Sequence, residues 1–206
     1  VKTALSNGEA TVNVAITAGK AVADMLTEMK AKTVQANQAG LDTASKDALQ
    51  NDFTSLRDQL TTIVQTAEFN GKNLITSTAT SLTVLSTVDG STISVAAQKL
   101  DTTTLGINAS NISSGASAAL VAIDAAINTV TSSLASMGSS SKRIDVQSEF
   151  TVQLVDILKE GVGNLVDADL AEESAALQSL QIKQQLGVQA LSIANSGPQS
   201  ILALFG

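Results

Sequence analysis

Residues 119–137 read ALVAIDAAINTVTSSLASM, and their large apolar side chains recur at alternating intervals of three and four positions. The repeating residues are Leu120, Ile123, Ile127, Val130, Leu134 and Met137. This spacing puts them on one face of a helix that packs as a coiled coil. The same register continues more weakly through Ile144, Val155, Leu158, Val162 and Leu165. We therefore predict a long helix over about residues 115–160, broken or bent near Gly138 and ended by Gly161 and Gly163.

Two further helical patterns precede this one. The first predicts a helix over about residues 1–35 and is carried by Val12, Ile16, Gly19, Ala23 and Leu26. The second predicts a helix over about residues 43–68 and is carried by Leu49, Phe53, Leu56, Leu60, Ile63 and Ala67. Thr43 or Ser45 can cap the start of the second helix. Asn70-Gly71 is expected to end it, because both residues tolerate the left-handed conformation of a helix C-terminus.

Between the second and third helices the period changes to that of a strand. Residues 81–100, SLTVLSTVDGSTISVAAQKL, are rich in β-branched residues around Asp89-Gly90, a two-residue type I′ turn signal. We predict a small β-hairpin region within residues 71–112. The expected fold is mainly α: a long antiparallel helical rod, or coiled-coil bundle, with the hairpin region at its tip. A rod domain is expected over residues 1–165, followed by a C-terminal segment over residues 166–206.

The composition excludes several kinds of chemistry. The chain has no Cys and no His, so thiolate and imidazole metal sites, thiol nucleophiles and imidazole bases are impossible. The net charge is −7 and only 2% of residues are aromatic, which argues against nucleic-acid binding. Gln, Ser and Asn interrupt every apolar stretch, so we expect no membrane insertion. The first residues look like the interior of a helix, so we expect the native N-terminus to precede Val1.

Two polar clusters could suggest a site, but each has a simpler explanation. Asp167, Asp169, Glu172 and Glu173 fit no calcium loop, and Asp169 with Glu172 has the spacing of a capping box that starts another helix. Residues 139–142 place three Ser before Lys142, and neighbours on a helix do not face one another. We therefore expect no metal, no cofactor and no enzymatic activity.

The last thirty-odd residues have almost no charge, because Lys183 is the single charged side chain from Ser174 to Gly206. On a helical wheel one apolar face is formed by Leu170, Leu177, Leu180, Val188 and Leu191. A roughly opposite apolar face is formed by Ile182, Leu186 and Ile193. A helix that is apolar on two faces needs two partners. The residues alone leave two interpretations of this helix open: it serves self-assembly, or it is an ordinary helix of an intramolecular bundle.

Three stretches of the sequence resemble bacterial flagellins. Residues 164–206 contain the family's D-A-D, its L-x-x-x-Q-x-x-Q-Q core, A-L-x-x-A-N, P-Q and a closing pair of Leu. Residues 67–75, AEFNGKNLI, are similar to the F-N-G turn that follows the family's second outer-tube helix. Residues 100–108, LDTTTLGIN, are similar to the segment that closes its hairpin region. The resemblance covers essentially the whole chain in order and is strongest to alphaproteobacterial flagellins.

The resemblance implies a structural subunit of the flagellar filament that polymerises through coaxial terminal helices. It implies secretion by the flagellar type III apparatus, an extracellular location, and self, an export chaperone, and filament cap and junction proteins as partners. The tail residues expected to serve assembly and chaperone binding are Leu170, Leu177, Leu180, Ile182, Leu186, Val188, Leu191, Ile193, Leu202 and Leu204. The alternatives are a hook–filament junction protein of the same architecture and a coiled-coil signalling stalk.

One segment departs from the family pattern. Many flagellins carry R-E-L-A-V-Q in a segment that the Toll-like receptor for flagellin recognises. In this sequence residues 26–38, LTEMKAKTVQANQ, correspond to that segment. Lys30, Ala31 and Lys32 stand where Arg, Glu and Leu would be, and Val34 and Gln35 are kept. The resemblance therefore implies weak activation of that receptor.

Overall fold

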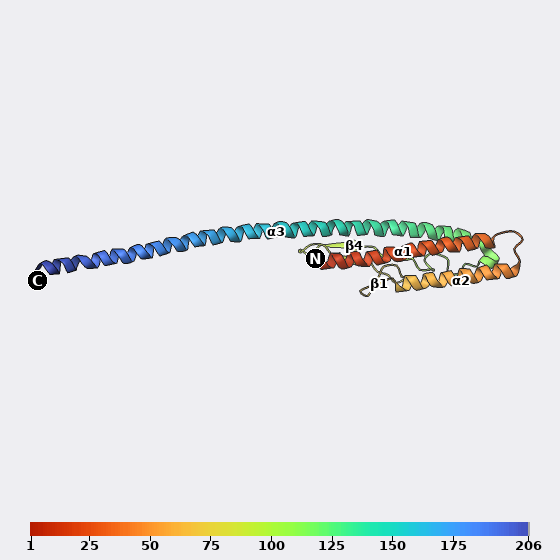
Figure 1. Ribbon diagram of the computed structural model, residues 1–206. Helices are drawn as coiled ribbons and strands as arrows, with labels where there is room; N and C mark the ends of the chain where they lie inside the picture. Colours follow the sequence, from red (N-terminus) through yellow and green to blue (C-terminus); the bar gives the residue numbers. More distant parts are fainter. Residues whose placement is uncertain (206) are drawn as a thin grey trace. The chain divides into compact units, whose positions relative to one another are not determined.

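The computed structural model describes the backbone of residues 1–205 and the side chains of residues 1–166 and 170–194. The chain forms two compact units, Val1–Val152 and Gln153–Gly206, which we call the rod unit and the tail unit. The rod unit contains α1 (Lys2–Ala36), α2 (Thr43–Thr66), two small hairpins and the first part of α3 (Ile112–Phe205), as Figure 1 shows. This confirms the predicted fold class, mainly helical with a small hairpin region. The predicted domain boundary at residue 165 falls inside the tail unit.

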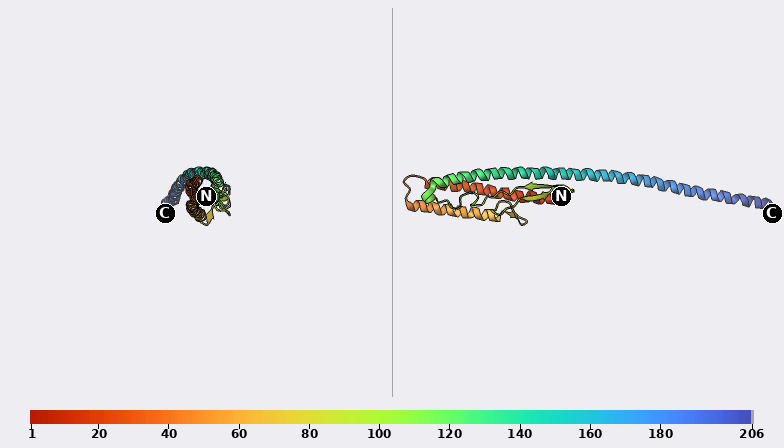
Figure 2. Two further views of the ribbon diagram at one scale, coloured as in Figure 1. Left: turned by 90° about the vertical axis from the view of Figure 1, so that its right-hand side faces the viewer. Right: turned by 180° about the vertical axis from the view of Figure 1, so that it is seen from behind.

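Within the rod unit, α3 runs antiparallel to α1. Contacts pair Lys30 with Asp124, Gly19 with Leu134 and Asn13 with Ser141, so residue numbers fall along α1 as they rise along α3. The helix α2 runs antiparallel to α1 and lies beside it, as Figure 1 and the right-hand view of Figure 2 show. The three helices therefore form the antiparallel bundle that the apolar spacing predicts.

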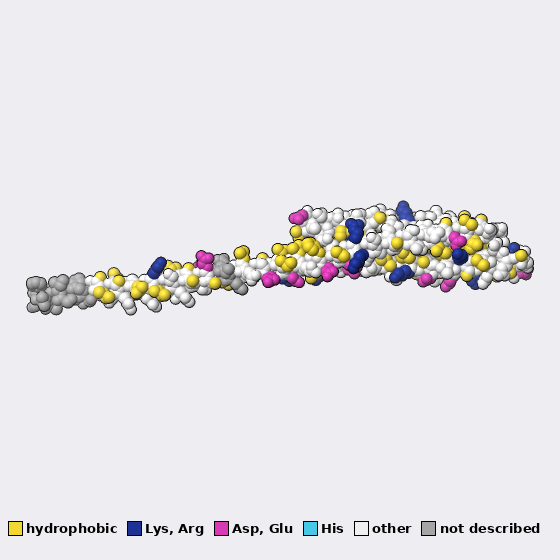
Figure 3. Space-filling model, turned by 90° about the horizontal axis from the view of Figure 1, so that it is seen from above, with side chains coloured by type: hydrophobic (Ala, Val, Ile, Leu, Met, Phe, Trp, Pro, Cys, Tyr) yellow, Lys and Arg dark blue, Asp and Glu magenta, His cyan; other side chains and the backbone are white. Residues whose placement is uncertain are grey.

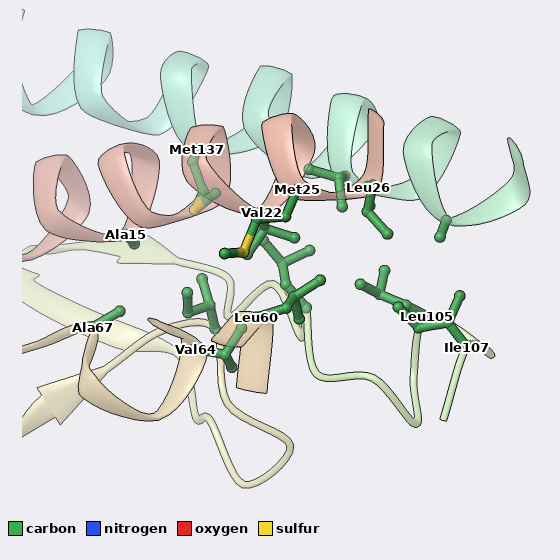
Figure 4. Close-up of a cluster of buried hydrophobic side chains, with 14 of the residues drawn as sticks. Ala15, Val22, Met25, Leu26, Leu60, Val64, Ala67, Leu105, Ile107 and Met137 are labelled. Atoms are coloured by element: carbon green, nitrogen blue, oxygen red, sulfur yellow. The ribbon is translucent and has the colours of Figure 1, made fainter. Parts of the chain in front are cut away.

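The core of the rod unit is built from the predicted apolar faces. In α3, Ile123, Val130, Met137 and Ile144 are buried, and in α2 Phe53 and Leu60 are fully buried. Figure 4 shows Val22 and Leu26 of α1 in one cluster with Leu60 and Val64 of α2, Met137 of α3, and Leu105 and Ile107 of the preceding loop. The helices α1 and α3 approach closely at Gly19, where even a Cβ would lie 3.0 Å from Leu134 Cδ2. Gly19 thus allows α1 and α3 to approach closely at this point.

The two hairpins differ from the prediction in their turns. Strands β1 (Glu68–Phe69) and β2 (Lys72–Asn73) pair antiparallel, as do β3 (Leu82–Leu85) and β4 (Thr92–Val95). The two-residue turn with positive φ at both positions is Asn70-Gly71 (φ 49° and 75°), so the prediction that these residues end α2 is wrong; α2 ends at Thr66. The prediction of a type I′ turn at Asp89-Gly90 is also wrong. That turn needs φ above zero at both residues, and here Gly90 alone has it, in a longer loop closed by the bond from Ser86 N to Ser91 O (2.8 Å).

The hairpins lie along the rod unit and not at its tip, which corrects that part of the prediction. A Cβ on Gly8 would lie 2.5 Å from Val84 Cγ2, so β3 packs closely on the N-terminal part of α1. Gln147 Nε2 of α3 donates to Ser86 O at 3.1 Å on the same side. The rod's tip is instead the loop between α1 and α2 together with the start of α3 (Figure 1). Because α2 has 24 residues and α1 has 35, the strands take the place that α2 leaves empty.

The helix α3 continues through every glycine that was expected to interrupt it. The single residue with non-helical φ and ψ inside its described range is Gly115 (φ −140°, ψ 42°), so the predicted end at Gly161 and Gly163 is wrong, and the helix is not broken at Gly138. The predicted new start at Asp169 is wrong as well, although the Asp169 side chain lies outside the described residues. An isolated glycine costs a helix only about 1 kcal/mol relative to alanine, which neighbouring helical turns can offset.

The N-cap of α2 is Asp42, and not Thr43 or Ser45 as predicted. The Asp42 backbone is extended (φ −73°, ψ 162°), and its Oδ1 accepts a hydrogen bond from Ser45 N at 3.1 Å. Hydrogen bonds from Ser45, first from its side chain and then from its backbone N–H, hold the pKa of Asp42 below its ordinary value. The cap therefore works best when Asp42 is ionised.

Replacing Asp42 by Ala is expected to lower the melting temperature at pH 7, because the cap is lost. Since folding lowers this pKa, the stability it contributes is full above the ordinary aspartate pKa of about 4 and disappears as pH falls through the folded value. Circular dichroism melts from pH 7 to pH 2 should show the two proteins converging in acid. Asp58→Ala is the matched control on the same helix. Equal melting temperatures for Asp42→Ala and Asp58→Ala at pH 7 would contradict the cap.

Candidate assembly surface

The described part of the tail unit is one helix with exposed apolar side chains. Eight of the ten tail residues named from the sequence are 52% to 73% exposed: Leu170, Leu177, Leu180, Ile182, Leu186, Val188, Leu191 and Ile193. The other two, Leu202 and Leu204, lie outside the residues whose side chains are described. Figure 3 shows hydrophobic and uncharged side chains along most of the described tail. The tail unit therefore presents a long surface that water solvates poorly.

The tail's apolar side chains form two faces, because α3 is helical over this range. At 100° per residue, Leu177, Leu180 and Leu191 fall on one side, and Ile182 and Leu186 on the other. Gln178, Gln181 and Gln185 lie between the two faces on one edge. Full burial of one Leu or Ile side chain contributes about 1.5–3 kcal/mol, so covering both faces would strongly favour association. A surface of this kind marks a protein interface.

The described residues show no arrangement suited to metal binding. Among them no group of three or more Asp, Glu, His or Cys could hold a metal ion. Of the acidic cluster named from the sequence, Asp167 and Asp169 lie outside the described side chains. In the serine run, Ser140 Oγ donates to the backbone carbonyl of Ser136, and Ser141 Oγ lies 3.4 Å from Asn13 Oδ1 of α1. These hydroxyls therefore serve the helix and its packing.

The segment that corresponds to the receptor motif lies in the last turns of α1. Lys30 Nζ lies 2.7 Å from Asp124 Oδ1 of α3, and Lys32 Nζ lies 2.7 Å from Asp52 Oδ2 of α2. Ala31, Val34 and Gln35 are exposed. Neither ion pair could be predicted from the sequence, because the partners lie on other helices and no local spacing signals them. Weak receptor activation stays a prediction.

One part of α3 meets a simple test for a membrane span, contrary to the expectation from the sequence. A window within Ile112–Ala194 has a mean hydropathy of 1.4, long and apolar enough to cross a membrane by length and composition alone. Core helices of water-soluble proteins pass the same test, so it carries little weight here.

Together, the antiparallel rod and the two-faced apolar helix define a helical structural subunit built to associate. Comparisons with known proteins agree. Residues 1–80 match the model of the bacterial flagellin N-terminal helical region, and residues 120–205 match that of the bacterial flagellin C-terminal helical region. The chain belongs to the bacterial flagellin family, the structural subunits of the flagellar filament.

Individual relatives agree with this assignment. Flagellin FljM of Caulobacter vibrioides is 49% identical over 208 residues, covering 100% of this chain and 76% of that protein. A flagellin of Brucella melitensis is 35% identical, covering 100% of this chain and 77% of that protein. These relatives confirm the predicted resemblance to alphaproteobacterial flagellins.

Two solved structures share the fold. The crystal structure of Bacillus cereus flagellin matches with a TM-score of 0.66 and 20% identity, covering 72% of this chain and 88% of that one. A putative flagellar hook-associated protein from Vibrio parahaemolyticus matches with a TM-score of 0.63 and 16% identity, covering 79% and 88%. At these identities the likeness concerns the fold alone.

Proposed function

We propose that this flagellin polymerises through its tail unit, whose two apolar faces each pack against a helix in the assembled filament. The observation that carries the proposal is the exposure of eight apolar side chains, from 52% to 73%, on two sides of one helix. The low charge of the tail supports this proposal. A buried charge without a partner is costly, whereas the amides of the tail's glutamines can form hydrogen bonds when buried. The tail and rod together would then act as a non-enzymatic element of the motility propeller.

The same exposed surface implies how the subunit is handled before assembly. Apolar faces of this extent promote aggregation when they are left uncovered. We propose that an export chaperone covers the tail inside the cell, that the flagellar type III apparatus secretes the subunit, and that cap and junction proteins contact the filament outside the cell. The tail residues that serve assembly would then also serve chaperone binding.

The proposed function is tested in an alphaproteobacterium that lacks its own flagellins. The chain, with whatever its gene encodes on either side, should restore long filaments seen by electron microscopy, and should restore swimming. A hook–filament junction protein, which shares the fold, would instead leave cells with hooks and no long filament. Cells without filaments, despite secretion of the protein, would contradict the proposal.

A further inference from the structure

The rod unit contains two Asn-Gly dipeptides that the fold places in different backbone conformations. They are Asn7-Gly8 in α1 and Asn70-Gly71 in the turn between β1 and β2. Asparagine loses its side-chain amide most readily before glycine, because glycine has no side chain to shield its backbone nitrogen. The same dipeptide at two positions therefore shows what the tertiary structure adds to this reactivity.

The reaction is an attack of the backbone on the side chain. The amide nitrogen of the glycine attacks Cγ of the asparagine, and its proton passes to water. The bond between Cγ and Nδ2 breaks, ammonia leaves, and a cyclic imide remains. One water molecule then opens the imide at either carbonyl, which gives aspartate, or isoaspartate, in which the main chain runs through Cβ and Cγ. The first step needs a glycine N–H without a hydrogen bond, and room for that peptide group to turn.

The Asn7-Gly8 dipeptide meets neither requirement. Gly8 lies inside α1, where each N–H donates to the carbonyl four residues earlier, and this series has already begun at Leu5 N, 2.9 Å from Val1 O. Gly8 is also buried, and a Cβ there would lie 2.5 Å from Val84 Cγ2. Reaction at Asn7 therefore requires α1 to open and β3 to move away.

The Asn70-Gly71 dipeptide meets both requirements. It joins β1 to β2 just beyond the C-terminal end of α2, and both residues are exposed (Figure 1). Nothing lies within 4 Å of a Cβ built on Gly71, and among the described residues its N–H donates no hydrogen bond. The flanking strands have two residues each, so the turn opens at little cost.

The two asparagines share their surroundings in other respects. Both line one hollow of about 280 Å³, and among the residues that line it Lys72 alone is ionisable. Water and nearby charge are therefore similar at the two positions, and the backbone makes the difference. We infer that Asn70 is a site of spontaneous deamidation in the folded protein, whereas Asn7 is protected. The inference concerns the rod unit and does not depend on polymerisation.

The two products have different consequences for the hairpin. Aspartate keeps the turn, because it tolerates a positive φ nearly as well as asparagine. Isoaspartate adds one methylene group to the main chain, so a two-residue turn no longer fits between Phe69 and Lys72. The hairpin then pulls on Asn73, whose Nδ2 donates to Val64 O at 2.7 Å and ties β2 to α2. Isoaspartate at this position therefore destabilises the rod unit, and its share rises with the age of the protein.

Peptide mapping tests the inference, because trypsin cuts after Lys and Arg and gives peptides 3–20 and 58–72, each with one Asn-Gly. The full protein, with whatever its gene encodes on either side, is incubated in mildly alkaline buffer, digested and analysed by liquid chromatography and mass spectrometry. Asn70 should convert at least about tenfold faster than Asn7, which reacts only when α1 opens locally. In urea the two rates should agree within about twofold, because both dipeptides are then unfolded.

Three results in the folded protein would overturn the inference: equal rates at the two asparagines, a faster Asn7, or an unreactive Asn70. Asn70→Gly is the matched control, because glycine adopts the positive φ of the turn (49°) and has no amide to lose. During incubation the melting temperature of the unmodified protein should fall as isoaspartate accumulates, and that of Asn70→Gly should stay constant. An equal fall in both would overturn the consequence for the hairpin. Filament formation, followed separately by electron microscopy, tests the proposed function alone.

Discussion

Leu180→Glu combined with Leu186→Glu is expected to abolish filament formation while the rod unit stays folded. The two residues lie on different apolar faces of the tail and are 61% and 59% exposed, so neither substitution disturbs a buried core within the described structure. Each carboxylate would have to be desolvated in the assembled filament without a partner, a cost of several kcal/mol at each site in every subunit. Electron microscopy should show no filaments, and circular dichroism melts should match the unmodified protein.

The matched control places the same two charges between the apolar faces. Gln178→Glu with Gln185→Glu adds two carboxylates to the same helix, at positions that lie on the polar edge. This variant should still assemble. Normal assembly of the Leu180→Glu, Leu186→Glu protein would refute the role proposed for the tail, and equal failure of the glutamine control would show that net charge and not the apolar faces is decisive.

Gly8→Val is expected to destabilise the rod unit by about 1–3 kcal/mol, the usual cost of overfilling a packed core. Even a single Cβ on Gly8 would lie 2.5 Å from Val84 Cγ2, and Val84 is buried and stiff because it is β-branched. The strand must therefore move away from α1. Chemical denaturation followed by circular dichroism measures the loss as a lower midpoint.

A second glycine and a second substitution isolate this clash. Gly138 also lies in a helix, but nothing lies within 4 Å of a Cβ built there, so Gly138→Val should not destabilise the protein. Adding Val84→Ala to Gly8→Val should recover much of the lost stability, because it removes the atoms that the new side chain meets. Equal effects at Gly8 and Gly138 would show that the close approach of β3 is unimportant.

The apolar periodicity of the sequence predicted those features that depend only on residues close together along the chain. The apolar repeat from Leu120 to Met137 predicted a helix face whose side chains are buried or half-buried in the rod unit. The hairpin turns were harder to predict from the sequence. Asn-Gly and Asp-Gly are both signals for a two-residue turn, and only the pairing of the strands shows which of them forms one. Asn70-Gly71 closes a two-residue turn between Phe69 and Lys72, whereas Asp89-Gly90 sits in a longer loop.

The helix α3 illustrates the limit of glycine as a stop signal. Gly138, Gly161 and Gly163 lie within a helix that ends at Phe205, because one glycine lowers helix stability only modestly and none of these positions needs a positive φ. Gly106 and Gly40, where φ is +72° and +90°, do need one, and both lie in loops. The residue type is the same, and the surroundings decide its role.

By itself, the amino-acid sequence determined the helical rod, the absence of thiol and imidazole chemistry, and a tail with two apolar faces, because spacing and composition are local properties. Only the tertiary structure decided that Gly8 makes room for Val84 and that Lys30 and Lys32 pair with Asp124 and Asp52. Each of these joins residues from different elements. Such contacts depend on how the elements pack, and no spacing within one element encodes them.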